Sequence, residues 1–247
     1  MGKIIAVASG KGGVGKTTLS SALGIQFASL GKKTLVIDGD VGLRNIDIHL
    51  SVFNDVVYDL WDVLLGRCEL EKAALRCPQS PHLYCLASPQ AVLPSEVPEN
   101  IFSDLCKKAA DIFEIIIIDC PAGIGKLFFD AVKAADTVLV VTTPDNASIR
   151  DGQRIAQLTR GFKRKRVRLV INRVNPLMIK KHYASNIDEI IDNVSVQLIG
   201  LIPESPAFQK LANGNLKQLK AKSPEQISIH DIALRLTGKQ KPLYKFW

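Results

Sequence analysis

Residues 9–18 of the 247-residue chain read SGKGGVGKTT. Within this stretch, Gly10 to Thr17 fits the pattern G-x-x-x-x-G-K-[ST] of a phosphate-binding loop, which follows a strand and opens a helix. The flanking sequence has both elements: KIIAVAS (3–9) is apolar and β-branched, and TTLSSALGIQFASLG (17–31) places large apolar residues at helical spacing. The stretch therefore predicts a site for nucleotide phosphates at the junction of a buried strand and a helix.

The loop also predicts which groups hold the phosphates. Backbone N–H groups of residues 12–17 are expected to point at the β- and γ-phosphates, aided by the positive end of the helix dipole. Glycine is required because a β-carbon would block the close approach. Lys16 is expected to reach the phosphate oxygens, and the Thr17 hydroxyl to ligate Mg²⁺. The expected nucleotide-binding residues of the loop are Gly12, Gly13, Val14, Gly15, Lys16 and Thr17.

Apolar segments with the composition of buried strands recur along the rest of the chain. They are KTLVID (33–38), HLYCLA (82–87), EIIIID (114–119), TVLVVTT (137–143), VRLVINRV (167–174) and VQLIGLIP (196–203). Helices are predicted over 97–112, entered from residues 94–95, over 148–160 and over about 224–236. This alternation predicts one α/β domain over 1–247, a P-loop NTPase with a mostly parallel twisted sheet of about seven or eight strands and helices on both faces.

Three carboxylates stand where strands of this sheet end. Asp119 closes the IIIID strand, Asp38 closes KTLVID, and Asp40 follows two residues later. Because the carboxyl ends of parallel strands line the ligand crevice, all three are expected to face one Mg–nucleotide, with Asp119 holding a Mg²⁺-bound water. Turn formation beside Gly39 and Gly42 is the alternative role for Asp38 and Asp40.

Composition narrows the class of protein. The five cysteines form no C-x-x-C pair, which argues against a disulfide framework or a zinc site and fits free thiols in a reducing cytoplasm. The longest apolar runs are far short of the roughly 20 residues needed to span a bilayer, and the N-terminus lacks a signal-peptide layout. The net charge of +8 permits contact with nucleic acid or acidic lipid without requiring it.

Four segments together resemble the MinD/ParA family of deviant Walker-A ATPases: SGKGGVGKTT, VIDGDVGLRNIDI, IIIIDCPAGI and ASIRDGQRI. GLRNID is the most specific of them for the MinD-type branch, whose members place the division septum. The resemblance covers residues 1 to about 246. It implies an ATP hydrolase with ATP/ADP and Mg²⁺ as cofactors, which forms a homodimer with ATP and is reset by hydrolysis to ADP and phosphate.

The resemblance accounts for a second lysine in the loop. It implies that Lys11 crosses a dimer interface and contacts the phosphates of the ATP in the other subunit, where an added cation stabilises the transition state. Asp40 resembles the residue that orients the attacking water, and Asn45 resembles its helper. Asp38 is placed near the Mg²⁺ shell, so the implied metal site is Thr17, Asp38 and Asp119.

The family pattern also places the base. Thr18 is expected at the α-phosphate, and Asn172 and Arg173 in VINRV, with the backbone after Pro203, match segments that hold adenine. Guanine readers use N-K-x-D, whose aspartate accepts from the guanine ring. This chain has Asn-Arg-Val-Asn at 172–175, so ATP is favoured over GTP.

Two departures from the family pattern bear on function. Cys120 takes a position usually filled by a small hydroxyl residue, and little loss is expected from it. The tail over 237–247 stands about where a membrane-targeting amphipathic helix would begin, and Gly238 and Pro242 interrupt it. Either the tail packs on its own domain or it forms a weak interfacial patch. The patch would consist of Leu243, Tyr244, Phe246 and Trp247 beside Lys241 and Lys245.

The sequence allows more than one interpretation of the partners and of the cellular role. The segment with Ser148, Arg150 and Asp151 resembles the one that meets division-inhibitor and activator proteins of the Min type, or it is a solvated helix face. The run FKRKRVR (162–168) is either a solvated connection or a non-specific DNA contact. The expected location is the cytoplasm, with peripheral contact at the inner face of the membrane as a variant. A ParA-type partition or flagellar-placement ATPase is the alternative function, and an iron–sulfur carrier is disfavoured by the missing C-x-x-C.

Overall fold

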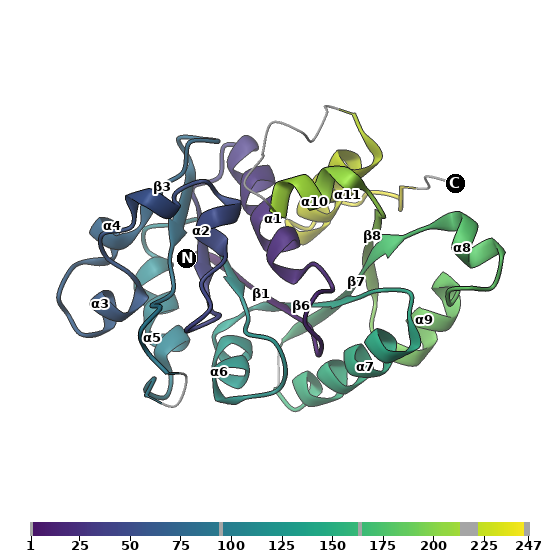
Figure 1. Ribbon diagram of the computed structural model, residues 1–247, viewed down its shortest axis with the longest axis horizontal. Coiled ribbons are helices and arrows are strands. Elements are labelled where there is room, and N and C mark those ends of the chain that lie inside the picture. The colour runs from purple at the N-terminus through teal and green to yellow at the C-terminus, as the bar shows by residue number, and fades with distance from the viewer. Residues whose placement is uncertain (1, 94–95, 163–164, 213–221, 245–247) are drawn as a thin grey trace.

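The computed structural model describes residues 2–93, 96–162, 165–212 and 222–244 (Figure 1). Three features predicted from the sequence fall partly outside these ranges. They are the helix entry at 94–95, two residues of the basic run at 163–164, and the end of the tail at 245–247. In the described part of the chain, no helix is both long and apolar enough to cross a bilayer.

Within the described residues, one eight-stranded sheet forms the middle layer, in the order β3-β4-β2-β5-β1-β6-β7-β8. Every neighbouring pair is parallel except β3 and β4, which are antiparallel. The fold class and all seven predicted strands are confirmed, and the two-residue edge strand β3 is the eighth. The strands are β1 Lys3–Ala8, β2 Thr34–Asp38, β3 Leu75–Arg76, β4 Leu83–Leu86, β5 Ile115–Asp119, β6 Thr137–Thr142, β7 Arg166–Val174 and β8 Leu198–Pro203.

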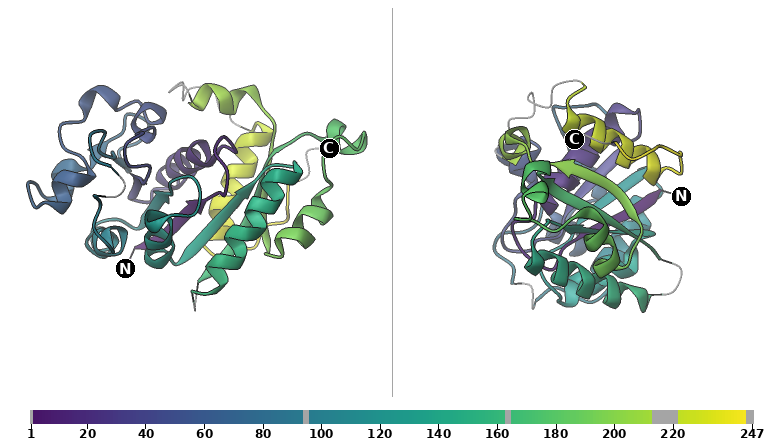
Figure 2. Two further views of the ribbon diagram at one scale, coloured as in Figure 1. Left: turned by 60° about the horizontal axis from the view of Figure 1, so that its bottom comes forward. Right: turned by 90° about the vertical axis from the view of Figure 1, so that its right-hand side faces the viewer.

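Helices cover both faces of this sheet (Figure 2). Helices α1 (Lys16–Ser29), α10 (Pro206–Ala212) and α11 (Pro224–Leu236) pack on one face, while α5 (Ile101–Ala109), α6 (Lys126–Ala134), α7 (Asn146–Arg160) and α9 (Ile187–Val194) cover the other. The described residues also form shorter helices, which are α2 Ile46–His49, η1 Phe53–Asp55, α3 Leu60–Leu64, α4 Leu70–Ala73 and α8 Pro176–Lys180.

The period-two alternation of the strands divides the core in two. In β1, Ile5 and Val7 face α1 and α11, whereas Ala6 and Ala8 face α5 to α7. Strand β5 lies between β1 and β2, and all five of its residues are buried. A strand buried on both faces must be apolar throughout, which explains IIII. The polar residue Asp119 comes at its carboxyl end, where the ligand edge of the sheet begins.

Two predicted helix bounds differ from the structure for local reasons. The helix predicted over 97–112 begins only at Ile101, because Asn100 takes a left-handed backbone conformation with φ of 64°. The helix predicted from residue 148 begins two residues earlier, because the Asp145 side chain caps it by accepting from the Ser148 N–H.

Candidate functional site

The phosphate loop links β1 to α1 at the carboxyl edge of the sheet. Gly13 and Gly15 have φ values of 81° and 91°, a left-handed region that glycine reaches without strain. A β-carbon added at Gly12 or Gly13 would meet no protein atom within 4 Å, so this side of the loop is open. Gly15 immediately precedes α1, whose first N–H groups have no partners within the helix. The loop has the open, donor-rich form that a phosphate needs.

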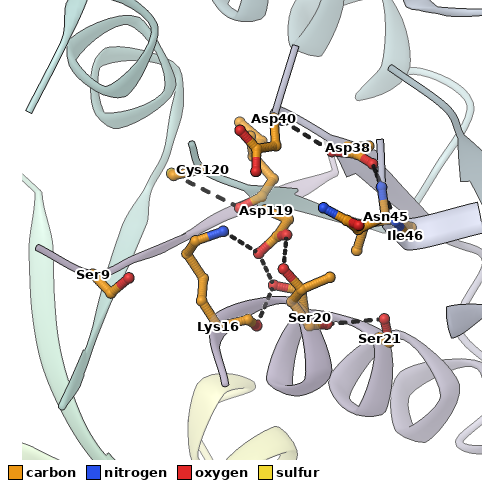
Figure 3. A network of polar contacts seen from close by, with 12 residues as sticks. Ser9, Lys16, Ser20, Ser21, Asp38, Asp40, Asn45, Ile46, Asp119 and Cys120 are labelled. Atoms are coloured by element: carbon orange, nitrogen blue, oxygen red, sulfur yellow. Dashed lines mark hydrogen bonds and ion pairs between the residues drawn. The ribbon is translucent and has the colours of Figure 1, made fainter. Parts of the chain in front are cut away.

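Asp119 joins the loop to the middle of the sheet. Its Oδ1 accepts from Lys16 Nζ at 3.1 Å and from the Ser20 hydroxyl at 2.8 Å, and its Oδ2 accepts from the Thr17 hydroxyl at 2.7 Å (Figure 3). Burial alone would lower the pKa of Lys16, but the Asp119 carboxylate outweighs that effect and leaves this pKa raised. Lys16 therefore stays charged although its side chain is only 8 % exposed. Ser20, which lies one helical turn after Lys16, is a member of the site that no sequence motif predicts.

Asp38 holds backbone groups of the segment that follows β2. Its Oδ1 accepts from the Asp40 N–H at 2.9 Å, and its Oδ2 accepts from the N–H groups of Asn45 at 2.7 Å and Ile46 at 3.1 Å. Burial raises the pKa of this carboxyl to about 6, and the charge of the neighbouring Asp119 adds to the rise. Asp38, one of the three residues predicted for the metal site, thus has both oxygens engaged by the backbone.

Asp40 and Asn45 also lie at the carboxyl edge of the sheet (Figure 3). Asp40 is partly buried, and burial raises the pKa of its carboxyl, while the charge of Lys16 opposes this rise. Asn45 is exposed, and its backbone N–H is the group that contacts Asp38. Lys11 is exposed on the loop, where its carbonyl accepts from the Ser9 hydroxyl at 3.0 Å.

A pocket of about 250 Å³ opens beside the start of α1. It brings together four of the residues predicted to hold the α-phosphate and the base, and Asn172 is fixed there by donating to the Val14 carbonyl at 2.7 Å. The predicted residues are Thr18, Asn172, Arg173 and Pro203; Glu204, Ser205 and Phe208 also line the pocket and follow no recognisable motif. A β-carbon at Gly15 would overlap the Asn172 amide, so glycine is required at this contact as well.

The donor set fits a metal completed by a nucleotide. Mg²⁺ takes oxygen ligands and keeps several waters, and it is usually bound by one or two protein groups plus phosphates. The Thr17 hydroxyl and the Asp119 carboxylate supply such oxygens at the loop. Among the described residues, no group of three or more His, Cys, Asp or Glu side chains is arranged to hold a metal alone.

Comparison with known proteins identifies the family. The family model described as an AAA domain matches residues 2–179. The septum site-determining protein MinD of Bacillus subtilis is 36% identical over 246 residues, which is 98% of this chain and 92% of that protein. The chain belongs to the MinD/ParA family. It is therefore a member of a family of P-loop ATPases, as the loop geometry and the four sequence segments indicate.

Solved structures of MinD/ParA members extend the match to three dimensions. In the MinC:MinD cell division protein complex of Aquifex aeolicus, a chain 36% identical to this one superposes with a TM-score of 0.86, covering 98% of both chains. The septum site-determining protein MinD of Pyrococcus horikoshii, solved with Mg-ADP, is 26% identical and superposes with a TM-score of 0.83, covering 96% of both chains.

The buried Asp38 predicts a pH dependence of stability. Because its pKa is raised from 3.8 to about 6, its contribution is present below pH 3.8 and is lost as the pH rises through 6. A shift of this size corresponds to about 3 kcal/mol. Without Mg²⁺ and nucleotide, the free energy of unfolding of the wild type should therefore fall by about 2 kcal/mol relative to Asp38→Asn between pH 4 and 7, as measured by urea denaturation, because pH 4 already lies just above the pKa of 3.8.

The exposed Asp104, whose side chain is 65 % accessible, provides the control. Asp104→Asn should follow the wild-type curve across this range. Parallel curves for wild type and Asp38→Asn would show that the carboxylate pair at the sheet edge does not perturb Asp38.

Proposed function

We propose that this protein is a MinD-like ATPase switch that regulates placement of the division septum. Mg–ATP drives formation of a homodimer, and hydrolysis to ADP and phosphate resets it. The observation that carries the proposal is a complete phosphate loop, with Lys16 neutralised by Asp119, that leaves a second lysine, Lys11, exposed at its open side. Full-length similarity to MinD proteins, one of them solved with Mg-ADP, supports the same function.

The loop residues bind and orient the nucleotide. The N–H groups from Gly12 to Thr17 hold the β- and γ-phosphates, and Lys16 turns from Asp119 towards their oxygens. Thr17 and Asp119 hold Mg²⁺, which supplies charge neutralisation at the phosphates when bound. The base enters the pocket beside Asn172 and Pro203.

Hydrolysis requires a water aligned with the γ-phosphate. Asp40 is proposed to orient this water by accepting its hydrogen bond, because its carboxylate stands near Lys16 at the open edge of the loop. Asn45 assists from the end of the same segment. Lys11 of the partner subunit supplies an additional cation for the charge that spreads over the phosphoryl oxygens, so hydrolysis depends on the dimer.

Three exposed apolar side chains support dimerisation through the carboxyl edge of the sheet. Leu43 follows β2, Leu93 follows β4 and Ile124 follows β5, and their exposed fractions are 71%, 64% and 45%. The loops after parallel strands share one edge of the sheet, so these side chains lie in loops at the same edge as the phosphate loop. Large apolar side chains exposed around a polar site are typical of a surface that becomes covered.

A Min-type partner is proposed for the surface of α7. A MinD chain in complex with MinC is among the similar structures. Ser148 is unavailable for such docking because it is 2% exposed and its hydroxyl accepts from the Thr143 N–H at 2.9 Å. Asp151 packs against Gly10, where a β-carbon would lie 2.6 Å from its own. The exposed Arg150 is therefore the member of the predicted segment that is free to meet a partner.

The switch is tested by measuring mass and phosphate release together. Wild type should be a dimer with Mg–ATP and a monomer with Mg–ADP in size-exclusion chromatography with light scattering. Asp40→Ala should slow phosphate release by about 100-fold, because the water loses its orienting group, and should remain a dimer. Asp104→Ala serves as the control and should behave as wild type. Hydrolysis at the wild-type rate by Asp40→Ala would remove Asp40 from the mechanism.

Peripheral contact with an anionic membrane is proposed for the amino edge of the sheet, which lies opposite the phosphate loop. A groove of about 620 Å³ there is lined by Arg168, Gln197, Leu198, Ile199, Arg235, Lys239, Gln240, Lys241 and Pro242. Burial lowers the pKa of the nearby Lys3, and repulsion from the charge of Arg166 lowers it further. In the described part of the chain, neither Lys239 nor Lys241 has a carboxylate within ion-pair distance.

The described part of the tail is fixed against this groove. Arg235 donates to the carbonyls of Ile199 at 2.7 Å, of Lys241 at 3.0 Å and of Pro242. Leu243 follows with 41% of its surface exposed. Cations beside an exposed apolar side chain suit an acidic lipid surface, since each lysine near such a surface contributes about 1 kcal/mol.

Co-sedimentation with vesicles of anionic lipid tests the membrane contact. Wild type should pellet with these vesicles at low salt, and the double variant Lys239→Glu/Lys241→Glu should bind at least about 10-fold more weakly, because it reverses two charges. Lys107→Glu, which alters an exposed lysine on α5, should pellet as wild type. Wild type that binds duplex DNA with ATP and ignores the vesicles would favour the partition-type function instead.

A further inference from the structure

The segment from Asp40 to Asp47 has a strained backbone. The N–H groups of Leu43 and Arg44 both donate to the Asp40 carbonyl, at 3.1 and 3.2 Å, which closes a tight turn. Arg44 has φ of 42°, within the left-handed region that side chains other than glycine adopt only at a cost. A conformation of this kind persists only where the surrounding structure holds it.

A buried ion pair lies at the strained residue. Arg44 Nε donates to Asp47 Oδ2 at 2.5 Å, and the two side chains are 11 % and 0 % exposed. The guanidinium also lies 5.6 Å from the centre of the Phe53 ring and donates to the Phe53 carbonyl at 3.4 Å. The other Asp47 oxygen accepts from the Ile48 N–H at 2.9 Å. A desolvated pair with these extra contacts is costly to break, because the remaining charge would be buried alone.

A residue of the sheet makes a second set of contacts with the same segment. Asp38 binds the N–H groups of Asn45 and Ile46, directly after Arg44. Asp38 therefore fixes the backbone near both ends of the segment, because it also accepts from the Asp40 N–H. Asp47 adds a contact to the Arg44 side chain between them. Neither Arg44 nor Asp47 is needed to bind phosphate in the proposed mechanism.

We propose that the Arg44–Asp47 pair is a positioning device for hydrolysis. By holding Arg44 in its left-handed conformation, the pair keeps Asp40 and Asn45 at the distance from the phosphate loop that aligns the water. This inference rests on the proposed ATPase function for its catalytic consequence, whereas its structural part concerns the segment alone. Arginine is required because its planar fork can contact Asp47, the Phe53 carbonyl and the Phe53 ring together, which an ammonium cannot do.

Arg44→Lys tests the proposal because it keeps the charge and removes the fork. It should lower kcat by about 10-fold or more, since small misplacements of catalytic groups are expensive. The affinity for Mg–ADP, measured by calorimetry, should stay within about 3-fold of wild type, because the phosphate loop is untouched. Amide hydrogen exchange over residues 41–47 should accelerate, while exchange in β5 and α1 should not change.

A matched control comes from a second arginine–aspartate pair, between Arg67 and Asp62 of α3. Arg67 Nη1 lies 3.3 Å from Asp62 Oδ1, but its side chain is 62 % exposed. Arg67→Lys makes the same chemical change without altering the segment, and it should leave kcat and the exchange of residues 41–47 at wild-type values. Asp47→Asn is the second test variant and should match Arg44→Lys in both readouts.

The outcomes separate this inference from the proposed function. Unchanged exchange over 41–47 in Arg44→Lys, or faster exchange with unchanged kcat, would overturn the positioning role. If wild type releases no phosphate under any condition, the ATPase function fails, and the exchange experiment still decides whether the pair holds the segment. A loss of Mg–ADP affinity equal to the loss of kcat would show a general structural role and would also contradict the proposal.

Discussion

The contacts of one carboxylate, that of Asp119, organise the site. This side chain stands at the end of the central strand, and it binds Lys16, Thr17 and Ser20 of the first helix. The lysine that a phosphate loop requires is thereby neutralised and positioned within the protein itself. The same contacts attach the first helix to the central strand. The form of the phosphate loop and the position of Lys16 are therefore both set by the Asp119 carboxylate. A nucleotide would replace Asp119 at Lys16, and Asp119 and Thr17 would hold Mg²⁺, which would supply charge neutralisation at the phosphates.

A second carboxylate is placed beside the first by sheet register. Asp38 pairs with Asp119 across β2 and β5, and both side chains are buried. Two like charges at such a position repel each other, and burial adds a larger cost, which together raise the pKa of Asp38. Three backbone N–H donors offset part of this cost by binding Asp38. The consequence is a division of roles: Asp119 holds the phosphate loop, and Asp38 holds the segment that carries Asp40.

How well the sequence predicts a feature of this structure depends on whether the interactions behind that feature are local or join distant parts of the chain. The strands and the phosphate loop depend on local patterns, so their positions were predicted closely, and the helix over 224–236 agrees to the residue. Helix α6 was missed because Gly123 and Gly125 precede it and favour a loop in any local interpretation. At the site, residue types and strand ends predicted Asp38 and Asp119. The bonds from Asp38 to Asn45 depend on how a loop folds back on the sheet, which no spacing reveals.

Asp119 binds Lys16 in the free protein, and we expect it to hold Mg²⁺ when a nucleotide is bound. This exchange can be measured by calorimetric titration of ADP, with and without Mg²⁺, into wild type and Asp119→Asn. Mg²⁺ should strengthen binding to the wild type, and the variant should lose most of this gain. The variant should also bind metal-free ADP at least as well as the wild type, because Lys16 is released. An equal gain from Mg²⁺ in both proteins would show that Asp119 does not hold the metal.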